Sequence, residues 1–177
     1  KHITNVFKLA GETSSGAERK AQVVWQIEKA LAEKAYSFDD RQNPAKINNP
    51  ITREGMQKLS PALDWSAYLK QVGAPESRLN VNEPEYFEQI SKVVQHKSWS
   101  EIQTYLAWQW IRRSAPFLGD DFEKEHFSFW QKELHGQKVM KPRWKICTQA
   151  VQDRLGYALA EVYVQSLNAA AIRAKVE

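Results

Sequence analysis

The sequence predicts an all-α fold: an irregular multi-helix domain with a long C-terminal helix and no sheet. Apolar residues recur at steps of three and four along most of the 177 residues, which is the spacing of one helix face. No stretch shows the sustained apolar–polar alternation of a half-buried strand. The chain contains only seven glycines and seven prolines, too few for a sandwich or barrel with many turns. We therefore expect a single helical domain over residues 1–177.

The composition is that of an ordinary globular protein with a sizeable core. Hydrophobic residues make up 42% of the chain and charged residues 26%, which excludes the disordered class. Seven Trp, six Tyr and seven Phe indicate large buried anchors. The net charge is only +4, and the 25 basic residues are interleaved with 21 acidic ones. This pattern favours a mixed solvated surface over a nucleic-acid partner. No apolar run approaches the ~20 residues that cross a bilayer, and the start is not typical of a signal peptide.

The first 51 residues predict two helices and then a loop. The run from Val6 to Ala10 indicates the end of a helix that stops near Gly11. From Tyr36 to Ile51 the helical pattern breaks, and the Asn, Asp and Pro residues there are typical of turns and loops. The amphipathic helix between these segments has a predicted buried stripe of Ala17, Ala21, Val24, Ile27, Leu31 and Ala35.

Two short helices are predicted next. Thr52 is expected to cap the first, which Pro61 ends. Asp64 starts the second, and Gly73 ends it in the left-handed conformation. The residues expected to face inward are Met56, Leu59, Trp65, Tyr68 and Leu69.

Two capping boxes predict the following helices. Asn82 to Glu85 is box-like, whereas Ser98 to Glu101 has the standard Ser-x-x-Glu form. The second helix should end at Ala115, because the residue before a proline is disfavoured in helical geometry. The apolar face of the first helix carries Tyr86, Phe87, Ile90 and Val94. The second helix has apolar residues on more than one side, so we expect it near the centre of the fold. These residues are Ile102, Tyr105, Leu106, Trp108, Trp110 and Ile111.

The last two predicted helices have one apolar stripe each. Asp120 and Asp121 suit the N-terminus of a helix that Gly136 closes. Its stripe is predicted to be Phe122, Phe127, Trp130 and Leu134. The long final helix starts at about Pro142, and its predicted stripe is Cys147, Val151, Leu155, Ala158 and Val162.

No catalytic, cofactor-binding or metal-binding residue is predicted in this chain. The four histidines are His2, His96, His126 and His135, and no two have the i, i+4 spacing of His-Glu-x-x-His. Glu123 and His126 form a Glu-x-x-His, but a carboxylate-bridged metal pair needs a second copy. An exposed helix surface is therefore favoured there over a metal site. The sequence also lacks a glycine-rich phosphate loop and a Gly-x-Ser-x-Gly elbow.

Two further groups of residues are assigned to structure. Cys147 lies on the predicted apolar stripe, so a core position is favoured over a reactive thiol. As the single cysteine it excludes a disulfide within these residues. The basic cluster could hold phosphate beside a stacked base, but packing of its long side chains along aromatic faces is favoured. The cluster consists of Lys138, Lys141, Arg143 and Lys145 with Trp144, of which Arg143 and Trp144 are assigned to structure.

A series of signatures in a fixed order spans nearly the whole chain. They are Trp25-Gln26-Ile27-Glu28-x-x-Leu31-Ala32, Arg41 with Asn43-Pro44, Leu59-x-Pro61 with Asp64-Trp65, Asn80-Val81-x-x-Pro84-x-Tyr86, Trp99, Tyr105-Leu106, Ala115-Pro116-x-Leu118, Phe127-x-Phe129, Gly136, Arg143-Trp144-x-x-Cys147, and Leu155-Gly156-x-Ala158-Leu159-x-x-x-Tyr163-Val164. Each signature is weak alone, but the ordered set resembles the neprilysin and endothelin-converting-enzyme family of zinc metallopeptidases.

The resemblance implies a piece of a two-part enzyme. In the family a thermolysin-like catalytic domain binds zinc through His-Glu-x-x-His and a downstream Glu-x-x-x-Asp. A mostly helical domain faces it across a chamber that admits only peptides. The chain resembles that helical domain, so we expect a helical cap that encloses the chamber, restricts substrate size, binds no zinc and is inactive alone. The implied partners are the catalytic domain of the same polypeptide and small peptides, with no nucleic acid and no membrane contact.

Two departures from the family pattern qualify this expectation. In animal members the cysteine matching Cys147 pairs with an earlier one that this chain lacks, which suits a bacterial member. After Val164 the chain continues with Gln165 to Ala169 in place of the family's aromatic and Pro-x-x-x-Lys pattern.

The resemblance implies that the protein is located in the bacterial periplasm, in the cell envelope or outside the cell. Two alternatives stay open: a free-standing helical module that binds a protein or peptide through exposed aromatics, and a nucleic-acid binder using Lys138 to Lys145.

Overall fold

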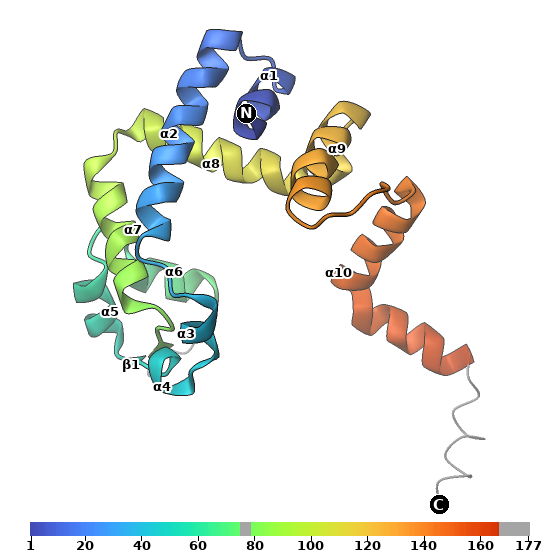
Figure 1. The fold of residues 1–177 in the computed structure, drawn as a ribbon. Coiled ribbons are helices and arrows are strands. Elements are labelled where there is room, and N and C mark those ends of the chain that lie inside the picture. The colour runs from blue at the N-terminus through green and yellow to red at the C-terminus, as the bar shows by residue number, and fades with distance from the viewer. Residues whose placement is uncertain (75–78, 167–177) are drawn as a thin grey trace, which may run out of the picture. The chain divides into compact units, whose positions relative to one another are not determined.

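The computed structural model describes residues 1–74 and 79–166, and these residues are mostly helical as predicted (Figure 1). The chain separates into two compact units, Lys1–Arg112 and Arg113–Glu177. The single domain expected over 1–177 stays a prediction. The elements are α1 (His2–Leu9), α2 (Ser14–Ala32), α3 (Phe38–Gln42), α4 (Pro44–Ile47), β1 (Pro50–Ile51), α5 (Arg53–Leu59), α6 (Trp65–Gln71), β2 (Leu79–Asn80), α7 (Pro84–His96), α8 (Trp99–Ser114), the 3-10 turn η1 (Ala115–Phe117), α9 (Asp120–His126), the π-helix η2 (Phe127–Glu133) and α10 (Arg143–Ser166).

The first core of unit 1 lies between α1, α2 and α8. Gly11 has a φ of +95° in the turn after α1, and the Thr13 hydroxyl accepts from the N–H of Gly16 to cap α2. The α8 residue Trp108 is buried here and contacts Phe7 at 6.3 Å between ring centroids. The predicted stripe is confirmed at Ala17, Val24, Ile27 and Leu31. Its last member, Ala35, lies beyond the end of α2, so that part of the prediction is wrong.

The loop expected over 36–51 contains two short helices, α3 and α4. The Ser37 hydroxyl accepts from the N–H of Asp40, and Asn43 Oδ1 accepts from the N–H of Ala45. Pro44 is the first residue of α4, where its missing N–H costs nothing. The same Asn, Asp and Pro chemistry that predicts turns therefore caps these helices.

A two-stranded antiparallel sheet, β1 with β2, contradicts the expectation of no sheet. Pro50 pairs with Asn80 and Ile51 with Leu79. Strands of two residues are too short to show an alternating pattern, so no sequence periodicity indicates them. The sheet borders the second core of unit 1, formed by Met56, Trp65 and Val81 with Ile51, Leu59, Leu79 and Phe87 around them.

The helix starts of α5, α6 and α8 are confirmed. Thr52 and Asp64 accept from the N–H groups of Gly55 and Ala67. Ser98 Oγ accepts from the N–H of Glu101, whose carboxylate accepts in return from the N–H of Ser98, which completes the predicted box. Three details are wrong: Tyr68 is 54% exposed, the residue before α7 is Glu83 rather than Asn82, and α8 ends at Ser114.

The prediction that α8 is central is also wrong. Only Trp108 is buried on it, whereas Trp99 and Trp110 are 69% and 76% exposed. The side toward α1 and α2 is packed and the other apolar sides are exposed. Apolar residues on several sides of a helix indicate surface that can be covered, but they do not identify what covers it.

In unit 2 a π-helix interrupts the expected stripe. The N–H of Leu134 bonds to the carbonyl of Phe129, which is the i to i+5 step of a π-turn. The extra residue in the turn rotates the subsequent side chains about the helix axis, so Leu134 is 53% exposed rather than inward-facing. Gly136, with φ +69°, ends the segment as predicted.

The long final helix, α10, is present as predicted, but its stripe is not buried. The backbone leaves helical geometry at Leu155 (φ −118°, ψ 24°), so α10 consists of two helical segments joined at a kink. None of its described residues is buried; Val151, Leu155 and Val162 are 49%, 58% and 63% exposed. Residues 167–169, which belong to the segment where the sequence departs from the family pattern, lie outside the described residues. Among the helices that are described, none is long and apolar enough to cross a membrane.

Candidate functional site

The histidines are dispersed and do not form a metal site. Within residues 1–74 and 79–166 there is no group of three or more His, Cys, Asp and Glu side chains that could hold a metal ion. His2 packs edge-on against Trp108, His96 Nδ1 lies 2.7 Å from the carbonyl oxygen of Lys92, and the ring of His126 lies 6.4 Å from that of Trp130. His135 is exposed. The donor set of the described residues does not fit zinc, so no step of a metal-dependent reaction is assigned to them.

The Glu-x-x-His motif has a structural role that differs from the exposed surface expected for it. Glu123 is only 6% exposed, and its Oε2 accepts from Arg143 Nη1 at 2.8 Å. The same guanidinium donates to the carbonyl oxygens of Leu118 at 3.2 Å and Phe117 at 3.3 Å. Arg143, from the start of α10, supplies the cation that pairs with this buried carboxylate. Arg143 therefore joins η1, α9 and α10, which agrees with the structural role expected of it.

Cys147 is exposed, so the prediction of a buried core cysteine is wrong. It fails for the same reason as the rest of its stripe, since that face of α10 is not covered. Trp144 is also exposed, at 65%, and the ammonium of Lys145 lies 5.4 Å from the centre of its ring. Within the basic cluster, the ion pair of Arg143 with the buried carboxylate of Glu123 accounts for the position of Arg143.

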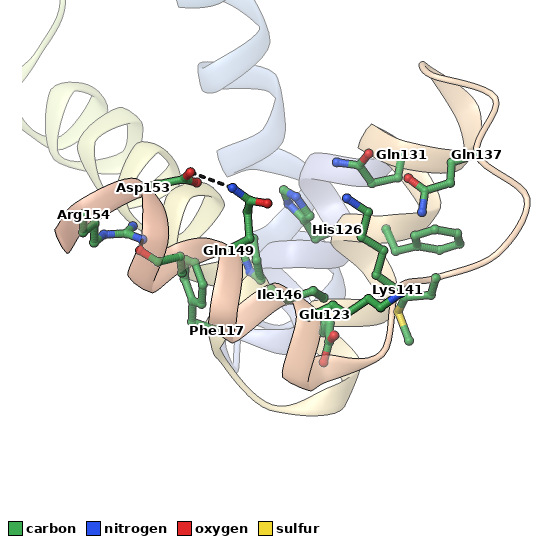
Figure 2. A pocket seen from close by; sticks show the side chains of 15 residues that line it. Phe117, Glu123, His126, Gln131, Gln137, Lys141, Ile146, Gln149, Asp153 and Arg154 are labelled. Atoms are coloured by element: carbon green, nitrogen blue, oxygen red, sulfur yellow. Dashed lines mark hydrogen bonds between the residues drawn. The ribbon is translucent and has the colours of Figure 1, made fainter. Parts of the chain in front are cut away.

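A pocket of about 320 Å³ lies within unit 2, between η1, α9, η2, the following loop and α10 (Figure 2). We call it the unit 2 pocket. Its apolar wall consists of Pro116, Phe117, Phe127, Met140, Ile146 and Ala150. The polar lining consists of Gln131, Gln137, Gln149, Glu123, His126, Lys141, Lys145, Asp153 and Arg154. Of these lining residues, the sequence patterns single out only Lys141, Lys145 and the Glu123–His126 motif. The other lining residues come together only when α10 packs beside α9, so no local pattern indicates them.

The acidic groups of the pocket are already engaged. Glu123 is bonded to Arg143, and Asp153 accepts from Gln149 Nε2 at 2.8 Å, a bond drawn in Figure 2. The guanidinium of Arg154 lies 5.3 Å from the ring centre of Phe117 and donates to the carbonyl oxygen of Ala150. No carboxylate of the described part of the chain forms an ion pair with the pocket's three cations: Lys141, Lys145 and Arg154. The pocket can therefore bind anionic groups, and its residues supply no nucleophile with an adjacent base.

A polar bridge in unit 1, not anticipated from the sequence, joins α2 to α8. Glu28 Oε1 accepts from Tyr105 Oη at 3.2 Å and from Gln109 Nε2 at 2.9 Å. Arg112 Nη2 donates to Gln109 Oε1 at 2.9 Å. Burial, reinforced by the charge of Glu28, raises the pKa of Tyr105 to about 12. The i, i+4 spacing of Tyr105 and Gln109 is a signal for this bridge only once α2 is known to pack beside them.

A second bridge in unit 1 holds the segment before α3 against the start of α7. Glu83 accepts from the backbone N–H of Tyr36 at 2.7 Å and from Arg41 Nε at 2.8 Å. Burial opposes ionisation of Glu83, but these two donors outweigh it and lower the pKa of Glu83. Nearby, Asn80 Oδ1 accepts from the N–H of Asn49 at 2.7 Å, which supports the sheet. The bridge and this bond give the signature residues Arg41 and Asn80 a structural role.

The chain is similar in sequence to mammalian endothelin-converting enzymes. Over 172 residues the chain is 27% identical to endothelin-converting enzyme 1 of Homo sapiens and 26% identical to that of Cavia porcellus. These alignments cover 93% of this chain but only 22% and 23% of the relatives. The chain thus spans about a fifth of the length of the curated relatives it matches.

The solved structures with a similar fold include the zinc metalloprotease Zmp1 of Mycobacterium tuberculosis. Its open state matches with a TM-score of 0.86 and its inhibitor complex with 0.84, each at 24% identity and covering 93% of this chain and 26% of that one. This similarity shows the fold. The family is identified by the sequence, because all of residues 1–177 match the N-terminal domain of peptidase family M13. This match confirms the resemblance: the chain belongs to peptidase family M13, the neprilysin family of zinc metallopeptidases.

Proposed function

We propose that this chain is the helical cap of a zinc-dependent metalloendopeptidase that hydrolyses small peptides. The cap would enclose the catalytic chamber, restrict substrate size and carry no catalytic residue. The observation that carries the proposal is the match of the whole chain to the N-terminal domain of a metallopeptidase family. The dispersed histidines are consistent with it, because zinc-dependent chemistry would then belong to another part of the polypeptide.

In this proposal the described residues act by forming a stable wall. The two cores of unit 1 and the bridges centred on Glu28 and Glu83 hold helices that are far apart in sequence. Confinement by such a wall selects peptides by size and shape, and its opening can limit substrate entry and product release. The partners are a thermolysin-like catalytic domain of the same polypeptide and the small peptides admitted to the chamber. We place the protein in a bacterial periplasm, in the cell envelope or outside the cell, which cell fractionation would test.

The decisive experiment compares the chain with the complete family polypeptide that contains it. We expect the chain alone to fold as helix, bind no stoichiometric zinc and cleave no peptide, whereas the complete protein should bind zinc and cleave. Metal content by mass spectrometry and cleavage by chromatography measure the two properties. Zinc binding with peptidase activity by the chain alone would contradict the proposal.

The proposed size selection by the cap is tested separately, with two substrates that contain the same cleavage sequence. One is a short peptide that the complete protein cleaves, and the other is the same sequence in an exposed loop of a folded protein. The free peptide should be cleaved and the loop should not, because the folded carrier cannot enter the chamber. Equal rates would leave the enzyme class intact but refute the cap's role in size selection.

The exposed face of α10 also favours a second function, a free-standing module that binds a protein or peptide. Leu155, Leu159 and Val162 are 58%, 47% and 63% exposed on it. Exposed apolar side chains gathered on one element are typical of interaction surfaces. Tight binding of an uncleaved peptide by the chain, together with no peptidase activity in the complete protein, would favour this alternative.

A further inference from the structure

The unit 2 pocket combines a cationic rim with amide side chains and an apolar wall, and no role has been assigned to it. We propose that it binds the carboxylate-bearing end of a short peptide. The proposal concerns this chain alone and is independent of whether the complete protein hydrolyses peptides.

Charge is the first argument for an anionic ligand. Lys141, Lys145 and Arg154 reach the pocket from the loop before α10 and from two different turns of α10. Arg154 is held by the Phe117 ring and the Ala150 carbonyl, which leaves its other donors available. Since no described carboxylate pairs with these cations, a ligand carboxylate would be the first anion to neutralise them.

The pocket's own acids do not compete for the cations. Glu123 is committed to Arg143 at 2.8 Å and lies on the α9 side. Asp153 is held by Gln149 at 2.8 Å within α10. Arg143 offsets the charge of Glu123, whereas the neutral amide of Gln149 leaves the charge of Asp153 in place. Lys141, Lys145 and Arg154 therefore outnumber the one lining carboxylate that has no cation partner, which keeps the local field positive.

Size and hydrogen-bonding groups favour a peptide over other anions. A volume of about 320 Å³ is at the lower end of the roughly 300–1,000 Å³ range of small-molecule sites, so it suits the end of a chain rather than a long segment. Gln131, Gln137 and Gln149 offer amide groups of the kind that pair with peptide N–H and C=O. Phe117 and Phe127 supply an apolar wall for one side chain. A single-stranded nucleic acid instead needs a groove that follows successive phosphates.

The test uses the 177-residue chain and two peptides that differ only at the C-terminus. The probes are acetyl-Gly-Phe-Ala with a free carboxylate and the same peptide as an amide, both without an N-terminal charge. Calorimetric titration should show saturable binding of the acid and binding of the amide about tenfold weaker, because exposed cations each contribute modestly. Saturable binding of the acid that is no tighter than that of the amide would overturn the proposal, as would no binding of the acid.

Variants locate the effect in the pocket. Lys141→Gln and Arg154→Gln should each weaken acid binding about threefold and leave amide binding unchanged, and the triple variant that includes Lys145→Gln should abolish the preference for the acid. Lys138→Gln is the matched control, because Lys138 is exposed on the same loop but does not line the pocket. All the substituted side chains are exposed, so circular dichroism should show unchanged folding. An equal loss in the Lys138 variant, or salt-dependent binding of an oligonucleotide without binding of either peptide, would overturn the proposal.

Discussion

The packing of α10 on α9 should depend on Arg143, and its removal should destabilise unit 2 by about 2–3 kcal/mol. Arg143→Ala removes a charge-assisted hydrogen bond to Glu123 at 2.8 Å and two weaker bonds, to the carbonyls of Leu118 and Phe117 at 3.2 and 3.3 Å. Hydrogen bonds to charged groups contribute about 1.5–3 kcal/mol each, and all three bonds involve the charged guanidinium. The total is discounted because Arg143 is half exposed and the two bonds to carbonyls are long. The rest of the lost stability comes from Glu123, because its carboxylate is only 6% exposed and would be left without a cation partner.

A double variant separates the two contributions. Glu123→Gln combined with Arg143→Ala should be about 1 kcal/mol more stable than Arg143→Ala alone, because an unpaired amide costs less to bury than an unpaired carboxylate. Arg143→Lys should retain the charge but lose stability, since a single ammonium cannot reproduce the bonds of the guanidinium to three acceptors. Lys138→Ala, on an exposed side chain of the same unit, is the control and should cost under about 0.5 kcal/mol.

The assay must follow unit 2 separately, because the chain has two compact units. Hydrogen exchange measured by mass spectrometry provides this, with peptides from α9 reporting on unit 2 and peptides from α2 as the internal reference. Protection of α9 should fall in Arg143→Ala while protection of α2 stays unchanged. Unchanged protection of α9, or an equal loss in both helices, would refute this explanation of how unit 2 is held together.

Three further predictions concern unit 1. Ile27→Ala should lower the free energy of unfolding by about 2–5 kcal/mol in urea titration, because Ile27 is 1% exposed in the first core; a loss under about 1 kcal/mol would contradict that packing. The Lys97 ammonium, then the backbone N–H and hydroxyl of Ser98, lower the pKa of Glu101 to about 2. Ionised Glu101 therefore stabilises the fold above its unfolded pKa of about 4.3, and this contribution is lost as the pH falls toward 2. In urea titrations, Lys97→Ala should reduce this loss of stability at acid pH, whereas Ser98→Ala removes the cap and should cost about 1 kcal/mol at neutral pH. Burial and the charge of Glu28 raise the pKa of Tyr105 to about 12. The neutral Tyr105 hydroxyl therefore stabilises the fold below about pH 10, and this contribution is lost as the pH rises through 12. Ultraviolet titration should show one tyrosine that ionises at higher pH than the others, and Tyr105→Phe should remove that transition.

The helix starts could be predicted from the sequence because they depend on neighbours within three residues. Thr52, Asp64 and Ser98 each bond an N–H group three positions ahead, so the sequence contains the whole interaction. The same chemistry in residues 36–51 predicts a loop where the structure has two short helices, because capping residues and turn residues are the same types. Local patterns thus locate a backbone feature without always distinguishing a one-turn helix from a turn.

Burial could not be predicted in the same way, because it depends on a second surface. The stripes of α8 and α10 are correct as helical patterns, yet Trp110 is 76% exposed and Leu155 58% exposed. Glu123 shows the converse: a charged residue on a short helix is buried, and its cation partner, Arg143, comes 20 positions later in the sequence. The unit 2 pocket could not be predicted for this reason, since its lining residues come from segments that only the fold brings together.

The family could be recognised without any catalytic residue because the signature residues hold distant segments together. Glu28 meets Tyr105 across 77 positions, Arg41 meets Glu83 across 42, and Asn80 meets Asn49 across 31. Such polar pairs are costly when one partner is missing, so each requires the other segment to be in place. An ordered set of them therefore specifies how the helices of this domain pack, rather than a reaction. That is the expected character of a domain whose proposed role is to enclose a chamber whose chemistry belongs to another part of the protein.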